Sequence, residues 1–113
     1  MQPEELYDKA MALYGAGERA YAADLLASAA ENGVAEAAYQ LGLMYELGDG
    51  VEADMSACCR WFSLAARLGS AEAQTRVAAL SLLGYAQGED ADALLRSAAR
   101  HGSAIAKGYL EDE

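Results

Sequence analysis

Apolar residues recur along the chain at the spacing of an amphipathic helix. Trp61, Ala65 and Leu68 form an i, i+4, i+7 stripe, and Leu41 and Met44 fall on one helical face. β-branched residues are scarce, and the single proline is the third residue. The pattern therefore predicts an all-α fold. The expected helices span about residues 3–15, 18–32, 35–47, 53–68, 70–87, 90–101 and 103–111.

A five-residue motif occurs three times. Ala-Ala-Glu-Asn-Gly at 29–33 recurs as Ala-Ala-Arg-Leu-Gly at 65–69 and as Ala-Ala-Arg-His-Gly at 98–102. Each copy ends in a glycine, which suits the left-handed residue that closes a helix. The two spacings between the copies, 36 and 33 residues, are typical of stacked helix pairs. The chain is thus expected to hold helix-turn-helix units at about 3–34, 35–70 and 71–102, followed by a capping helix at 103–113.

Residue size along the repeats favours stacking of these units. Gly42, Cys58 and Ala65 are small enough to let neighbouring helices approach closely, whereas Trp61 and Phe62 can fill the gaps between layers. A single helix pair is too thin to bury its own apolar face, so the pairs must pack against one another.

Residues 35–70 resemble one unit of the Sel1-like repeat family, a relative of the tetratricopeptide repeats. The matching positions are Ala35, Leu41-Gly42, Tyr45, Gly48-Asp49-Gly50-Val51, Asp54, Trp61-Phe62, Ala65-Ala66 and Gly69, with Cys58 in the place of an alanine. The flanking units match less well. The resemblance implies a right-handed α-solenoid whose concave face holds other proteins, as in adaptors and scaffolds.

In related repeats the first helix of each unit lines the concave face. Carried over to this chain, the candidate partner-binding residues are Glu4, Tyr7, Met11, Tyr14, Glu36, Tyr39, Leu43, Glu46, Leu47, Glu72 and Thr75, with Ala79, Leu82 and Leu83 at the end of the third unit. This surface is acidic, aromatic and apolar, so the hypothesis is a basic or amphipathic protein segment as ligand. The alternative for Tyr39, Leu43, Leu82 and Leu83 is ordinary packing between helices. The Lys and Arg clamp with which some tetratricopeptide proteins hold a terminal carboxylate is not expected here.

The charge narrows the class of partner. The formal net charge is −10 and the pI about 4.4, which disfavours nucleic acid and anionic membranes as partners. No signal segment or apolar run of membrane-spanning length is expected. Cys58 and Cys59 are adjacent, which does not suit an intrahelical disulfide, so a cytoplasmic protein with reduced thiols is the simplest interpretation.

No catalytic, cofactor or metal site is expected, and an enzyme is disfavoured. His101 is the single histidine, and Cys58 and Cys59 lack the spacing of zinc ligands. The acidic loop at 49–54 is too short for a calcium loop, and Asp54 is expected to cap the following helix. The main hypothesis is therefore a protein- or peptide-binding adaptor. The alternative is a self-associating structural module, or a small regulatory or chaperone-like protein.

Overall fold

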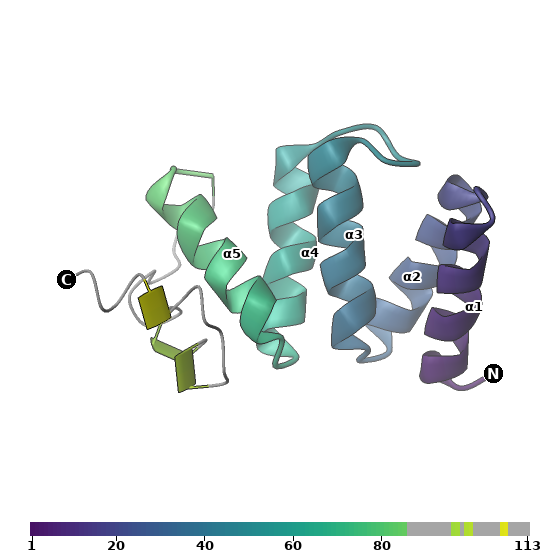
Figure 1. The fold of residues 1–113 in the computed structure, drawn as a ribbon, viewed down its shortest axis with the longest axis horizontal. Helices are drawn as coiled ribbons and strands as arrows, with labels where there is room; N and C mark the ends of the chain where they lie inside the picture. The colour runs from purple at the N-terminus through teal and green to yellow at the C-terminus, as the bar shows by residue number, and fades with distance from the viewer. Residues whose placement is uncertain (86–95, 98, 101–106, 109–113) are drawn as a thin grey trace.

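A computed structural model describes residues 1–85 together with residues 96, 97, 99, 100, 107 and 108 (Figure 1). Residues 1–85 contain helices but no strand. The helices are α1 (Pro3–Gly15), α2 (Arg19–Glu31), α3 (Ala35–Leu47), α4 (Met55–Arg67) and α5 (Ala71–Leu82). The all-α prediction is confirmed. The bounds expected for the first and third helices, 3–15 and 35–47, agree to the residue.

Short turns reverse the chain between successive helices, so that the helices stand side by side in a row (Figure 1). The pairs α1–α2 and α3–α4 form two hairpins, and α5 packs against α4. In this solenoid α1, α3 and α5, the first helices of the three expected units, run in the same direction (Figure 1). Their N-terminal ends therefore lie along the same long edge of the molecule (Figure 1).

Local signals in the sequence explain where the helices begin. The Asp54 carboxylate accepts hydrogen bonds from the backbone N–H groups of Ser56 and Ala57, which makes it the N-cap of α4. The Ser70 hydroxyl caps α5 in the same way through the N–H of Ala73. The expected capping role of Asp54 is confirmed.

The fifth helix is shorter than the 70–87 expected from the apolar pattern. It ends at Leu82 because Gly84 adopts a left-handed φ of +87°. The N–H of Tyr85 then bonds to the carbonyl of Leu80, and the N–H of Gly84 bonds to that of Ser81. The helix α5 therefore ends five residues before the expected bound at position 87. The helices expected at 90–101 and 103–111, including the capping helix, lie largely outside the described residues.

The core lies between the packed helices and takes residues from all five of them. Its largest fully buried side chains include Leu26 from α2, Leu41 and Met44 from α3, and Phe62 from α4. Many of the other core residues are alanines, which is why the helices can pack closely enough for Phe62 to lie directly against Gly42. Phe62 is fully buried and fills a gap between helices as expected, whereas Trp61 is only partly buried.

Candidate functional site

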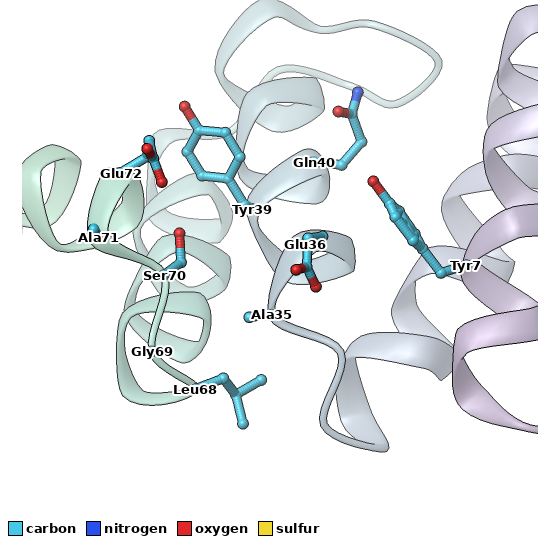
Figure 2. Close-up of a pocket in the computed structure, with 10 residues that line it drawn as sticks. All are labelled: Tyr7, Ala35, Glu36, Tyr39, Gln40, Leu68, Gly69, Ser70, Ala71 and Glu72. Atoms are coloured by element: carbon cyan, nitrogen blue, oxygen red, sulfur yellow. The ribbon is translucent and has the colours of Figure 1, made fainter. Parts of the chain in front are cut away.

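A groove of about 450 Å³ crosses the three parallel helices α1, α3 and α5 near their N-terminal ends (Figure 2). Its polar and aromatic lining comes from Tyr7, Glu36, Tyr39, Gln40, Ser70 and Glu72. The turn between α4 and α5, with Leu68 and Gly69, forms its lower edge (Figure 2). We call this cavity the α1–α3–α5 groove. It brings together four residues that the sequence placed on the concave face: Tyr7, Glu36, Tyr39 and Glu72.

The tyrosines of the groove are positioned by the core beneath them. Tyr39 packs on Phe62, with 5.5 Å between the ring centroids and an angle of 37° between the planes. Tyr7 stands on α1 and faces α3 across the groove (Figure 2). Burial raises the pKa of the Tyr7 phenol, and the nearby charge of Glu36 raises it further. Tyr7 therefore stays neutral and able to donate a hydrogen bond at physiological pH.

The carboxylates of the groove lie at helix starts. Glu36 is in the first turn of α3 and Glu72 in the first turn of α5, and both are exposed. The partial positive charge of a helix N-terminus stabilises an acidic side chain there. These two residues thus favour their own helices and also give the groove negative charge.

Arg76, which sequence reasoning did not place on this face, lies beside the groove. It donates a hydrogen bond to the Glu46 carboxylate at 3.3 Å, and its guanidinium carbon is 6.0 Å from the ring centroid of Tyr39 and 5.7 Å from that of Phe62. Arg76 therefore partly neutralises the charge of Glu46, which was a candidate partner-binding residue. The four-residue spacing from Glu72 was the available signal, since it places Arg76 on the same side of α5.

Tyr14 belongs to a separate cluster at the opposite end of α1. Its hydroxyl donates a hydrogen bond to the carboxylate of Asp49, in the loop between α3 and α4. Arg19 also donates to Asp49, at 2.5 Å, and its guanidinium carbon lies 4.5 Å from the Tyr14 ring centroid. Gly50 follows with φ +80°, and a Cβ there would lie 2.6 Å from the Cβ of Arg19. Tyr14 therefore joins the first helix hairpin to the loop of the second, and does not line the groove.

We expect Asp49→Asn to lower the thermal midpoint in a pH-dependent way. The hydrogen bond from Tyr14, and then that from Arg19, lower the pKa of Asp49 in the folded chain. A lowered pKa means that the carboxylate stabilises the fold above its unfolded pKa of about 3.9, and that this contribution disappears as the pH falls through the lower folded value. The gap in melting temperature between Asp49→Asn and the parent should therefore be larger at pH 7 than at pH 2. Calorimetry at both pH values measures it. Asp24→Asn, at an exposed carboxylate on α2, is the control, and an equal gap at both pH values would contradict the prediction.

Comparison with known proteins shows which family the middle of the chain resembles. Residues 35–70 match the family model described as the Sel1 repeat. This stretch is a Sel1 repeat. Its first helix is α3, which carries Glu36, Tyr39 and Gln40, and its last residue is Ser70. Much of the groove lining thus comes from the Sel1 repeat itself. No curated protein matches the chain.

Solved Sel1 repeat structures share the fold of the chain. A Sel1 repeat protein from Oxalobacter formigenes is 30% identical, with a TM-score of 0.83 over 92% of this chain and 46% of that one. A protective antigen of uropathogenic Escherichia coli with an SLR fold is 27% identical, with a TM-score of 0.83 over 96% of this chain and 25% of that one. Cysteine rich protein B of Helicobacter pylori, at 23% identity and a TM-score of 0.72 over 79% and 69%, shares the fold. The chain thus spans about half the length of the first of these proteins and a quarter of the second.

The other candidate residues differ in how much of each side chain is exposed. Met11 and Leu43 are partly buried against the core, Glu4 is exposed, and Leu47 is 72% exposed at the end of α3. Thr75 does not fit a partner-binding surface. It is only 6% exposed, and its hydroxyl donates to the carbonyl of Ala71 in its own helix.

The cysteines of the Sel1 repeat are both free and buried. Burial is the main cause that raises the pKa of Cys58, to about 12, and it also raises that of Cys59. Both thiols therefore stay protonated at neutral pH and are poor nucleophiles.

Within residues 1–85 and the six described beyond them, no group of three His, Cys, Asp or Glu side chains could hold a metal ion. His101 lies outside the described residues. No helix in the described part of the chain has the length and apolarity to cross a bilayer.

Proposed function

We propose that this chain is a protein-interaction module that binds a segment of a partner protein in the α1–α3–α5 groove. Proteins with Sel1 repeats generally mediate protein–protein interactions, and the family is typically non-enzymatic. The observation that carries the proposal is the convergence of Tyr7, Tyr39 and two carboxylates from three successive first helices into one groove. Tyrosine is common at the centres of protein interfaces, because it combines a large apolar surface with a hydrogen-bonding hydroxyl.

The charge of the groove favours a basic or amphipathic segment as the ligand. Glu36 and Glu72 give it two exposed carboxylates, and the whole chain carries a net charge of −10. Such a field attracts cationic protein segments and repels nucleic acid and anionic lipid surfaces. The proposed role is that of an adaptor or scaffold.

We also propose that the protein works in a reducing compartment such as the cytoplasm, which two free, buried cysteines support.

Selection of peptides from a random display library on the immobilised full chain tests the groove as the binding surface. The selected peptides should lose about tenfold or more in affinity for the double variant Glu36→Lys/Glu72→Lys, because two attractive charges become repulsive. Both positions are exposed, so the fold should tolerate the change with the loss of only the modest stabilisation that these carboxylates give their helix N-termini. The matched control is Glu5→Lys/Glu31→Lys, which reverses two exposed carboxylates that do not line the groove. Equal losses for both double variants, or none for the groove variant, would refute the groove as the site.

Self-association is the second candidate, favoured by one observation. Leu82 and Leu83 are 67% and 72% exposed at the end of α5, and Tyr85 beside them is 57% exposed. Contiguous exposed apolar side chains often mark interfaces. Sedimentation velocity at several concentrations separates the two candidates. A mass that stays that of the monomer throughout would exclude self-association, whereas a dimer dissociated by Leu83→Lys would support it.

A further inference from the structure

Two arginines of this chain are held by the same pair of chemical groups. Arg19 stacks on the ring of Tyr14 and bonds to the carboxylate of Asp49. Arg76 lies over the ring of Tyr39 and bonds to the carboxylate of Glu46. In both sets the tyrosine comes from a first helix of a unit, and the carboxylate comes from α3 or the loop after it. Each guanidinium therefore has a π face beneath it and an anion at its edge.

The arrangement follows from the chemistry of the guanidinium group. Its flat face is weakly hydrated and is attracted to the negative face of an aromatic ring, while the N–H groups at its edge suit carboxylate oxygens. A tyrosine beside a carboxylate thus satisfies both features of an arginine at once. The Arg19 and Arg76 sets show that the helices of this chain can build such a pair from neighbouring elements.

The α1–α3–α5 groove contains a third pair of the same composition. Tyr7 on α1 and Glu36 on α3 both line it, and Glu72 supplies a second carboxylate from α5 (Figure 2). In Figure 2 the Tyr7 ring and the Glu36 side chain are neighbours across the groove. Yet none of the basic residues that the structure describes lines the groove. The third tyrosine–carboxylate pair therefore lacks the cation that the other two hold.

We infer that Tyr7 and Glu36 form a subsite for one arginine side chain of a partner protein, which would stack on Tyr7 and bond to the Glu36 carboxylate, while Glu72, on the far side of Tyr39, adds negative charge to the same groove (Figure 2). This inference rests on the proposed function and names the residue type that the groove selects. Arginine fits better than lysine, because only the guanidinium has a planar face to stack on the ring and a fork of donors that matches the two oxygens of a carboxylate. Gln40 and Ser70, which also line the groove, offer further acceptors for its N–H groups.

Titration of the ¹⁵N-labelled full chain with N-acetyl-arginine amide, followed by NMR, tests the subsite. The expected result is a saturable shift of the backbone amides of Tyr7, Glu36 and Tyr39, with a dissociation constant in the millimolar range. N-acetyl-citrulline amide has nearly the same shape but no charge, and should bind about tenfold more weakly or not at all. The affinity of Nα-acetyl-lysine amide, whose side chain is charged but has no planar group, should fall between those of the arginine and citrulline probes.

Two protein variants complete the test. Glu36→Gln should weaken the arginine probe about fivefold or more while leaving citrulline binding unchanged, whereas Glu52→Gln, at an exposed carboxylate outside the groove, should leave both unchanged. Equal binding of arginine and citrulline probes, no shift in the groove, or an arginine response that Glu36→Gln does not alter would each overturn the subsite. Library peptides that bind in the groove without arginine would overturn it too, yet would leave the proposed function standing. Failure of every peptide to bind in the groove would refute the proposed function.

Discussion

Phe62→Ala should destabilise the chain by roughly 3–5 kcal/mol, as expected for truncating a fully buried phenylalanine. The Phe62 ring is completely enclosed, packs beneath Tyr39 and lies directly against Gly42. Alanine would leave a cavity at the junction of α3 and α4, which the helices can close only by shifting. Since a domain of this size has a total stability of about 5–15 kcal/mol, the loss would consume much of it. Urea denaturation followed by circular dichroism measures the change.

The control for this substitution is Tyr21→Ala, which removes a ring of similar size from an exposed position on α2. It should change the free energy of unfolding by less than about 0.5 kcal/mol. A loss below 1 kcal/mol for Phe62→Ala would show that Phe62 does not anchor the contact between α3 and α4. Because Tyr39 stands on Phe62, the folded fraction of Phe62→Ala should also bind groove ligands more weakly than Tyr21→Ala does.

The repeat pattern predicted the elements of the fold well because each element depends on local signals. The period of the Ala-Ala-x-x-Gly motif places a helix end at Gly33 and at Gly69, and both glycines adopt the left-handed conformation that closes a helix. The end of α5 also depends on a local signal, and the prediction was wrong because it overlooked that signal. Gly84 closes α5, but it lies within a mainly apolar stretch that begins at Val77, and that stretch favoured a longer helix.

The candidate site was predictable only in part. Register within the repeats correctly grouped Tyr7, Glu36, Tyr39 and Glu72, because equivalent positions of parallel helices face the same side. It could not predict which side chains pair with each other. The bond between Tyr14 and Asp49 joins residues 35 apart, and the Arg76–Glu46 pair joins residues 30 apart at non-equivalent positions of their units. Such pairs depend on rotamers and on the distance between helices, which no repeat pattern contains.

Thr75 shows a further limit of reasoning by register. It occupies the position of Tyr39 one unit later, yet it is buried whereas Tyr39 lines the groove. The short threonine side chain donates its hydroxyl to the carbonyl of Ala71, while the long tyrosine ring extends over Phe62. Equivalent backbone positions thus present different surfaces when the side chains differ in length.

Gly42→Ala should also destabilise the chain, although alanine is the better helix former. The substitution gains about 1 kcal/mol of helix propensity in the middle of α3. Against this, the new Cβ would lie 2.3 Å from Cδ1 and 2.4 Å from Cε1 of Phe62. The fully enclosed ring cannot turn away, so α3 and α4 must move apart, at a cost of about 1–3 kcal/mol or more for overpacking. Because the overlap exceeds 1 Å and involves ring atoms, we expect the steric cost to prevail, with a net loss of about 1–2 kcal/mol.

Two comparisons isolate the clash between Gly42→Ala and Phe62. Gly15→Ala is the matched control, since Gly15 ends α1 and a Cβ there meets nothing within 4 Å, so its stability should stay equal to the parent or rise slightly. In a Phe62→Leu background, where a smaller and more flexible side chain faces Gly42, the cost of Gly42→Ala should shrink or reverse. Urea denaturation of the four combinations of these two substitutions gives the coupling. A Gly42→Ala variant as stable as the parent, or a cost that Phe62→Leu leaves unchanged, would show that the close approach of α3 and α4 does not depend on the missing side chain at position 42.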